Sequence, residues 1–238
     1  MKPIRGFLFD AGNTLIRVRG SVGGVYASVA RRHGLAADAR VLEDSFRRAF
    51  HERKAGFLPA VSRPHSPERE RAWWRGLVEE VFREAAGWGA LPERFEAFFD
   101  ELYREFEEPR HWEVFPDVLP CLEDLKARGF PLGVLSNWDS RLHRVLGGLG
   151  LAERFRFVLV SAEFGAEKPD PEIFREAARR LERHPGEVLH VGDLIREDVR
   201  GAQDAGLQGL LLDRDGTSPA QVPRIADLRE LLRTAGGG

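Results

Sequence analysis

Short apolar runs alternate with helix-length segments from residue 113 to residue 212, and this alternation constrains the fold more than any other feature. A further apolar run, residues 7–9, lies near the N-terminus. Strands that alternate with single helices join as right-handed βαβ units, which build a parallel sheet covered by helices on both faces. The strands predicted in the second half are residues 130–135, 157–160, 188–191 and 209–212.

Residues 17–111 break this alternation. Four segments with apolar and aromatic residues at helical spacing follow one another there, with no strand pattern between them. We expect an inserted all-helical cap subdomain at residues 17–111. Residues 1–16 and 112–238 would then form the core, an α/β doubly wound parallel sheet of Rossmann-like type. The aromatic stripes could instead form a substrate surface, but such stripes are more often the core of a bundle.

The tail and the composition add smaller constraints. Ile225, Leu228 and Leu231 predict one short helix after residue 213. The net charge of −2 indicates no general preference for nucleic acid or anionic membranes. Cys121 is the single cysteine, which rules out an intrachain disulfide. No run approaches the roughly 20 apolar residues of a membrane helix, and the start lacks a signal-peptide pattern. We therefore expect a cytoplasmic protein.

Polar groups follow three of the predicted strands. Asp10 ends the first apolar run, Ser136 and Asn137 end the second, and Asp193 follows the run at 188–191. Because parallel strands share one carboxyl edge, these residues are expected to meet despite their distance in sequence. Lys168 lies between them in a loop with prolines at 169 and 171, which restrict its backbone.

These residue types suit phosphoryl transfer. Asp10 and Asp193 can hold Mg²⁺, which prefers one or two carboxylates together with water and phosphate oxygens, and Asp198 adds a third acid nearby. An aspartate can also attack phosphorus to form an aspartyl-phosphate. Donors suited to the oxygens of a phosphoryl group are the ammonium, hydroxyl and amide of Lys168, Ser136 and Asn137.

Each of these residues has a simpler interpretation. Asp193 and Asp198 could only favour the first turn of the helix that follows them. Ser136, Asn137 or Asp139 could be an N-cap. A lysine is usually a solvated charge, although a rigid loop in a chain with few lysines argues against that here.

Four segments of the chain, taken in order, resemble the motifs of the haloacid dehalogenase-like (HAD) hydrolase superfamily. These segments are residues 10–15, Ser136-Asn137, residues 168–171, and Gly192-Asp193 with Asp198. The resemblance implies a doubly wound parallel sheet, a cap inserted after the first motif, and in most members Mg²⁺-dependent phosphatase activity. It therefore covers nearly the whole chain.

The resemblance also implies roles. Asp10 would be the nucleophile and a Mg²⁺ ligand, Asp193 a second ligand and Asp198 a supporting acid, while Ser136 and Lys168 would hold the phosphoryl oxygens. The predicted catalytic residues are thus Asp10 and Lys168, and the predicted substrate-binding residues are Ser136, Asn137 and Thr14. The predicted metal-binding positions are Asp10, Gly12, Asp193 and Asp198. A small molecule is the expected substrate, with no nucleic-acid or membrane partner, and the oligomeric state stays open.

Position 12 departs from the phosphatase pattern, which places a second aspartate there as general acid and base. Gly12 has no side chain, although its carbonyl could still bind Mg²⁺. Losing such a group typically costs about 10²–10⁴ in rate, so we expect better activity on acidic leaving groups such as aryl or acyl phosphates. Two alternatives remain: a metal-independent 2-haloacid dehalogenase, whose halide needs no proton, and a non-catalytic member that binds a metabolite or partner.

Overall fold

The computed structural model describes residues 2–56, 66–85, 91–218 and 221–234. The chain forms two compact units, one made of Met1–Arg17 with Glu113–Gly238 and the other of Val18–Trp112. Within the described residues, no helix has the length and apolar character needed to cross a membrane.

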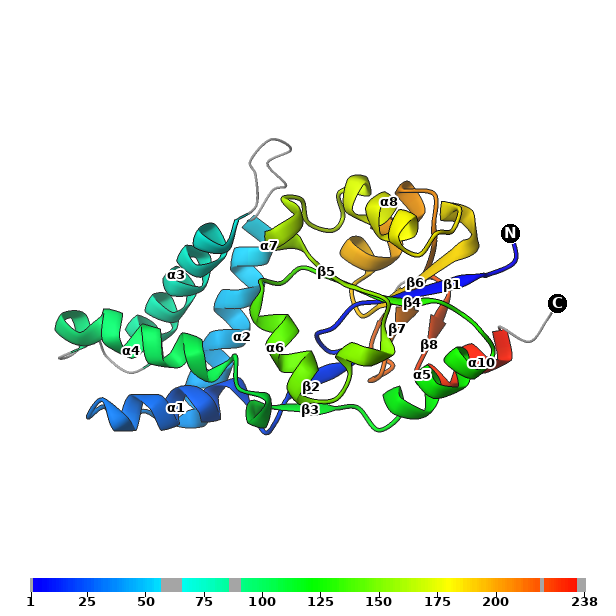
Figure 1. Cartoon of the computed structure of the whole chain (residues 1–238). Coiled ribbons are helices and arrows are strands. Elements are labelled where there is room, and N and C mark those ends of the chain that lie inside the picture. The colour runs from blue at the N-terminus through cyan, green and yellow to red at the C-terminus, as the bar shows by residue number, and fades with distance from the viewer. Residues whose placement is uncertain (1, 57–65, 86–90, 219–220, 235–238) are drawn as a thin grey trace. The chain divides into compact units, whose positions relative to one another are not determined.

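The first unit is built on a six-stranded parallel sheet with the order β5-β4-β1-β6-β7-β8 (Figure 1). This confirms the predicted doubly wound α/β fold. From the central strand β1 the chain moves outward through β4 and β5, then returns beside β1 and moves outward on the other side. The switch point between β1 and β6 is where such sheets place a ligand. The strands are β1 (Gly6–Phe9), β4 (Leu132–Ser136), β5 (Val158–Val160), β6 (Val188–Gly192), β7 (Gln208–Leu212) and β8 (Arg224–Ile225).

Helices cover both faces of this sheet because its central strands are apolar on both sides. Leu8 and Leu135 point into a buried cluster with Ile173 and Phe174 of α8 (Pro171–Arg180). Phe7 packs edge-on against Phe130 at 5.1 Å. Figure 1 shows α8 on one side of the sheet, with α5 (Val118–Ala127) and α10 (Leu231–Thr234) on the other.

Local signals explain where the helices of this unit begin and end. The Asp170 side chain accepts a hydrogen bond from the Glu172 amide at 2.8 Å, and Pro171 occupies the first position of α8. Gly129 follows α5 with a φ of +80°, a conformation that glycine adopts at little cost. The remaining helices are α6 (Arg141–Gly148), α7 (Ser161–Phe164) and α9 (Gly201–Asp204), with 3-10 turns at Ala152–Arg154, Pro185–Glu187 and Leu228–Glu230.

Several short elements differ from the prediction. Ile225 lies in β8 and not in the tail helix, because Leu212 pairs with it as the last parallel neighbour of the sheet. The helix-length segment between the strands at 188–191 and 209–212 begins with a wider, π-type turn at Ile195–Arg200 and becomes the α-helix α9 only afterwards. The four-residue α7 was not predicted. Such short elements carry too few residues for a periodic pattern.

Arg17 and Val18 also differ from the helical structure expected from residue 17 onward. They belong to β2 (Ile16–Val18), which pairs with β3 (Trp112–Val114) in a two-stranded sheet. These two strands contain the points where the chain passes between the units.

The second unit packs four helices around an aromatic core, so its stripes are core positions. Tyr26, Phe82 and Phe98 are almost completely buried there, and Phe82 meets Phe98 edge-on at 4.8 Å. Gly23 allows the first two helices to approach, since a Cβ at this position would lie 2.1 Å from the Ala39 carbonyl oxygen. The helices are α1 (Val22–Arg32), α2 (Ala39–Gly56), α3 (Pro67–Ala85) and α4 (Leu91–Glu105), followed by a 3-10 turn at Pro109–His111.

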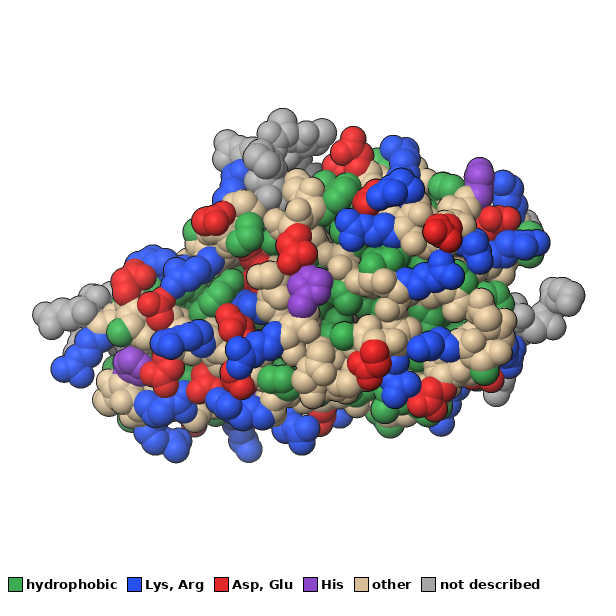
Figure 2. Space-filling view, viewed as in Figure 1, with side chains coloured by type: hydrophobic (Ala, Val, Ile, Leu, Met, Phe, Trp, Pro, Cys, Tyr) green, Lys and Arg blue, Asp and Glu red, His purple; other side chains and the backbone are tan. Residues whose placement is uncertain are grey.

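Charged side chains of both signs are interspersed over the face of the molecule seen in Figure 2. In the described part of the second unit, arginine–glutamate pairs join neighbouring helices, such as Arg53 with Glu80 at 2.6 Å and Arg32 with Glu101 at 2.5 Å. Exposed pairs of this kind each contribute only a few tenths of a kcal/mol, so the aromatic core dominates the stability of this unit.

Candidate active site

Asp10 stands at the carboxyl end of the central strand. Its amide donates to the Val191 carbonyl of β6 at 2.9 Å, which continues the sheet by one residue before the chain turns. The turn closes on Ala11, whose carbonyl accepts from the amides of Leu15 and Ile16 at 2.9 and 3.0 Å. The Asp10 side chain is only 11% exposed. The strand and the turn therefore fix a carboxylate at the switch point of the sheet.

Two residues distant in sequence donate hydrogen bonds to one oxygen of this carboxylate. Oδ1 of Asp10 accepts from the Ser136 hydroxyl at 2.9 Å and from Nζ of Lys168 at 2.7 Å. Lys168 is 3% exposed and also donates to Oδ1 of Asp198 at 2.6 Å. Burial alone would lower the pKa of Lys168, but the two adjacent carboxylates outweigh it and raise the pKa above its ordinary value. The lysine is thus a permanently charged bridge between two buried acids.

Asn137 holds the backbone of the loop that carries this lysine. Its Nδ2 donates to the Lys168 carbonyl at 2.8 Å, and its Oδ1 accepts from the Lys168 amide at 2.7 Å. Both ends of the amide are therefore engaged by one residue. In this structure Asn137 positions Lys168, which places the ammonium between its two partners.

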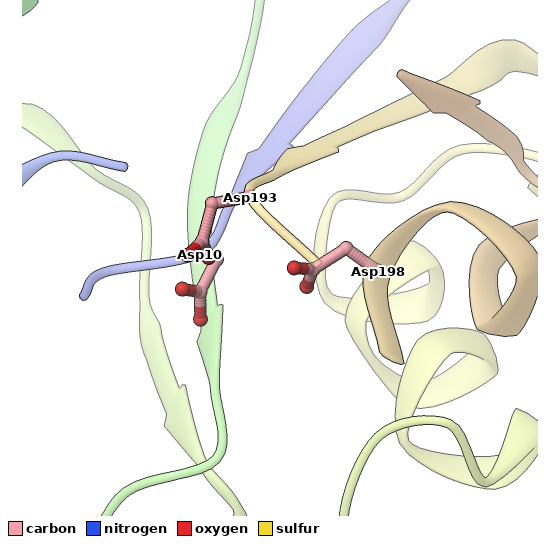
Figure 3. Close-up of side chains that lie close together, drawn as sticks. All are labelled: Asp10, Asp193 and Asp198. Atoms are coloured by element: carbon pink, nitrogen blue, oxygen red, sulfur yellow. The ribbon is translucent and has the colours of Figure 1, made fainter. Parts of the chain in front are cut away.

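Three aspartates gather at this edge of the sheet (Figure 3), and Lys168 bonds to two of them, Asp10 and Asp198. Asp10, Asp193 and Asp198 each offer a carboxylate oxygen, and these three atoms lie within 4.8 Å of one another. Asp193 directly follows β6, while Asp198 projects from the wider turn at Ile195–Arg200. Gly192 makes this approach possible, because a Cβ there would lie 2.3 Å from Oδ2 of Asp198. The structure thus brings together the three acids that the strand ends predicted.

Asp198 is fully committed to protein partners. Its Oδ1 contacts Lys168 and lies 2.9 Å from Nε2 of His190, and its Oδ2 accepts from the Leu194 amide at 2.9 Å. Burial raises the pKa of Asp198, but Lys168 and the hydrogen bond from His190 more than offset it and hold the pKa well below its usual range. This carboxylate stays ionised and supports the lysine.

His190 is a residue of this network that the sequence did not reveal. It is completely buried in β6 and packs edge-on against Phe174 at 5.3 Å. Burial lowers its pKa, so the neutral imidazole donates from Nε2 to Asp198. A single histidine inside an apolar strand has no motif spacing that would mark it as functional. Its partner, Asp198, is brought near only by the tertiary fold.

Asp193 is the acid with the least compensation. Burial and the neighbouring charges of Asp10 and Asp198 raise the pKa of its carboxyl to about 7. Asn13, whose φ of +54° lies in the left-handed region, donates only a long hydrogen bond to it at 3.4 Å. Among the described residues, no hydrogen bond to Oδ2 of Asp10 is recorded either. Three carboxylates face one lysine, and an all-oxygen set with excess negative charge fits a hard divalent cation.

Gly12 and Thr14 lie on the same turn. A Cβ on Gly12 would meet only Cζ3 of Trp138, at 3.6 Å, so the indole lies beside the position where a side chain would begin. Thr14 is completely buried, and its hydroxyl has no hydrogen-bond partner among the described residues. Its carbonyl accepts from Arg214 at 2.8 Å. Arg214 is a second residue that sequence reasoning missed, since nothing marks it among the many arginines of the chain.

Comparison with known proteins gives concordant results. Residues 4–206 match a family model described as haloacid dehalogenase-like hydrolase. The human haloacid dehalogenase-like hydrolase domain-containing protein 3 is 37% identical over 209 residues, which cover 88% of this chain and 82% of the relative. A phosphoserine phosphatase of Thermus thermophilus is 38% identical over 167 residues, which cover 68% and 66% of the two chains.

Solved structures similar to this chain include a 2-haloacid dehalogenase. The crystal structure of a 2-haloacid dehalogenase from Pseudomonas syringae superposes with a TM-score of 0.65 at 27% identity, covering 97% of both chains. The same scaffold is therefore found in proteins described as a phosphatase and as a dehalogenase, and the residues around Asp10 must decide between these chemistries.

Proposed function

Because the chain belongs to the haloacid dehalogenase-like hydrolase family and is a hydrolase, we propose that it is a Mg²⁺-dependent phosphatase. Its substrate would be a small phosphorylated metabolite, hydrolysed through an aspartyl-phosphate on Asp10. One observation carries the proposal: the carboxylate of Asp10 is held by Ser136 and Lys168 directly beside the undercompensated acid Asp193.

Asp10 is the proposed nucleophile. A carboxylate oxygen would form a bond to phosphorus while the bond from phosphorus to the leaving oxygen breaks, and the leaving group departs with its electron pair. Water would then attack the phosphorus of the aspartyl-phosphate, which releases inorganic phosphate and restores Asp10. Its Oδ1 is already occupied by Ser136 and Lys168, so these donors orient the carboxylate before the substrate arrives.

Lys168 supplies fixed positive charge where negative charge gathers. It is buried, held charged by Asp10 and Asp198, and positioned through its backbone by Asn137. A preorganised cation in a water-poor site stabilises a phosphoryl group far more than the same cation would in bulk water. We infer that Ser136 and Lys168 meet the phosphoryl oxygens.

Asp10, Asp193 and the Gly12 carbonyl are the groups that would hold Mg²⁺. When bound, the metal would neutralise charge on the phosphoryl oxygens as a Lewis acid. Asp198 supports the site differently, because its two oxygens are engaged by Lys168, His190 and the Leu194 amide. Asp193 carries the excess charge, which a cation would relieve.

The leaving group is the substrate feature that Gly12 restricts. No carboxylate stands at this position to protonate a departing alkoxide, and the neighbouring group there is the apolar edge of Trp138. Phenolates and carboxylates leave without such help, so aryl and acyl phosphates are the preferred substrates of this proposal. Alkyl phosphates such as sugar phosphates would react slowly.

We propose that the helical insertion, residues 17–111, acts as a cap that selects a small-molecule substrate, and that the protein works in the cytoplasm without nucleic-acid or membrane partners.

A 2-haloacid dehalogenase is the second candidate, and Gly12 is the observation that favours it. Halide departure needs no proton, and a relative of similar fold has this activity. Such an enzyme would use Asp10 to displace the halide and would need no metal. The undercompensated Asp193 beside Asp10 suits a cation that this metal-independent chemistry does not use, which favours the phosphatase. A non-catalytic member would have no use for the preorganised contacts on Oδ1 of Asp10.

One set of assays separates these functions. Phosphate release is measured from an aryl phosphate, acetyl phosphate and a sugar phosphate, with Mg²⁺ or with EDTA, alongside halide release from 2-chloropropionate. The proposal predicts Mg²⁺-dependent phosphate release that is fastest from the aryl and acyl compounds and absent in Asp10→Asn. Halide release in EDTA would establish the dehalogenase, and stabilisation by a phosphorylated ligand without turnover would establish the binding protein.

A further inference from the structure

Arg214 follows the carboxyl end of β7 and contacts the turn that follows Asp10. It lies two residues beyond β7, and one edge of its guanidinium faces two backbone carbonyls of that turn. Nη2 donates to the Thr14 carbonyl at 2.8 Å, and Nε donates to the Asn13 carbonyl at 3.3 Å. The side chain is 18% exposed, so water competes little for these bonds.

The other edge of Arg214 is anchored. Nη1 donates to Oδ2 of Asp117 at 2.9 Å, and this buried carboxylate oxygen also accepts from the Leu228 amide at 2.8 Å. The guanidinium carbon lies 3.9 Å from the centre of the Phe115 ring. An ion pair with a buried carboxylate and stacking on an aromatic face together fix the plane of the guanidinium.

The peptide bond between Thr14 and Leu15 links the hydrogen bond from Arg214 to Ala11, the residue next to the proposed nucleophile. The Thr14 carbonyl shares a planar trans peptide with the Leu15 N–H, so the two groups point in opposite directions. That N–H donates to the Ala11 carbonyl at 2.9 Å. A cation on the carbonyl side polarises the peptide and strengthens the hydrogen bond on the opposite side. Arg214 thereby acts on Ala11, which directly follows Asp10.

The second carbonyl belongs to the most unusual backbone position of the turn. Asn13 has a φ of +54°, and its side chain reaches Asp193 at 3.4 Å. Gly12, whose carbonyl we proposed above as a metal ligand, immediately precedes it. A hydrogen bond to the Asn13 carbonyl holds this conformation from outside the site.

We propose that Arg214 is a positioning residue: it holds the turn of residues 11–15 in the one arrangement that presents Asp10 and the Gly12 carbonyl together. The inference rests on the proposed function for its effect on rate, but its effect on the turn is independent of any activity. Among the described contacts of Arg214 none is to Asp10, so it acts only through the backbone.

Arg17 offers a matched control. Its guanidinium lies over the same Phe115 ring at 5.0 Å, and its Nε donates to Glu113 at 2.6 Å. Within the described part of the chain, its side chain makes no hydrogen bond to the turn. The variants are therefore Arg214→Gln, Arg214→Lys and Arg17→Gln, each measured for kcat and KM on an aryl phosphate with Mg²⁺. Displacing reacting groups by about an ångström costs on the order of 10²-fold.

Arg214→Gln is expected to lose about 10- to 100-fold in kcat, with KM little changed. Arg214→Lys keeps a cation near one carbonyl and should recover part of this loss, whereas Arg17→Gln keeps the rate of the unmodified protein. Partial unfolding lowers the amount of active enzyme but leaves kcat per active molecule unchanged. A lower kcat per active molecule with an unchanged KM, partly restored in Arg214→Lys, therefore indicates lost positioning of the turn. Should Arg214→Gln fail to fold, the comparison of Arg214→Lys with Arg17→Gln carries the test.

Amide hydrogen exchange of residues 10–17 separates the two proposals. Faster exchange of the Leu15 amide in Arg214→Gln, but not in Arg17→Gln, supports the positioning role of Arg214 even if the unmodified protein hydrolyses no phosphate ester. In that case only the proposed function fails. Exchange and kcat in Arg214→Gln that match those of the unmodified protein would overturn the inference, whatever the substrate.

Discussion

Gly12→Asp is the substitution that tests the leaving-group argument most directly. It places a carboxyl group at the position where phosphatases of the family carry a general acid. The structure accommodates it, because the new Cβ would meet only Trp138, at an ordinary contact distance of 3.6 Å. Gly12 is also outside the set of residues with positive φ, so the backbone imposes no strain on a larger side chain.

The magnitude follows from what would surround the new carboxyl group. Proximity to Asp10 and Asp193 would raise its pKa, because like charges disfavour ionisation, and the protonated form is the one that can act as an acid. General acid catalysis is worth about 10²–10⁴ when the acid is well oriented. The apolar edge of Trp138 provides contact but no hydrogen bond to orient it, so we expect the lower end, about 10².

The assay compares kcat/KM for an alkyl phosphate and an aryl phosphate with Mg²⁺. Gly12→Asp should raise the alkyl rate and leave the aryl rate almost unchanged, because a phenolate leaves without a proton. Gly12→Asn is the matched control, since it has the same size and no proton to give. Equal stimulation by Gly12→Asn, or no alkyl stimulation by Gly12→Asp in a folded protein, would refute the assignment of Gly12 as the missing acid.

Three further outcomes follow from the structure. Lys168→Met leaves two buried carboxylates without their shared cation. The variant should lose phosphatase activity, and urea titration should show a free energy of unfolding lower by about 3–5 kcal/mol. An unchanged free energy of unfolding would contradict the bridging role of Lys168. Adding Mg²⁺ should raise the melting temperature of the unmodified protein and raise that of Asp193→Asn much less, and equal shifts would remove Asp193 from the metal site. Gly23→Ala would drive a Cβ against the Ala39 carbonyl oxygen and should cost roughly 1–3 kcal/mol. Gly147→Ala is the control, because its Cβ would meet nothing within 4 Å and should be neutral or up to about 1 kcal/mol stabilising.

The sheet and the meeting of its strand ends could be predicted because they depend on simple rules. Ser136 and Asp10 are 126 positions apart, yet Ser136 ends one buried parallel strand and Asp10 follows another, and such strands share one carboxyl edge. The two-residue strand β8 escaped prediction for the opposite reason. Ile225 belongs to it through pairing with β7, which no local pattern expresses, and its spacing from Leu228 suggested a helix.

The supporting residues could not be predicted, since their roles depend on a single tertiary partner each. His190 is an ordinary member of an apolar run until Asp198 is placed 2.9 Å from its Nε2. Arg214 is distinguished from the other arginines only by the two carbonyls that it faces. Residue type indicates what a side chain is able to do, whereas packing decides what it meets.

The three acids of the site show this most clearly, because they share one side chain and differ in how many bonds each already makes. Asp198 has both oxygens occupied by a lysine, a histidine and a backbone amide, so it can only support. Asp10 has one oxygen occupied and one without a hydrogen bond from the described residues, the state that a nucleophile needs. Asp193 receives a long side-chain hydrogen bond from Asn13, and its pKa is raised to about 7 by burial and the neighbouring acids, the state that a cation relieves. A sequence pattern predicts three carboxylates at one edge of the sheet. The different role proposed for each one follows from the hydrogen-bond donors that contact its oxygens.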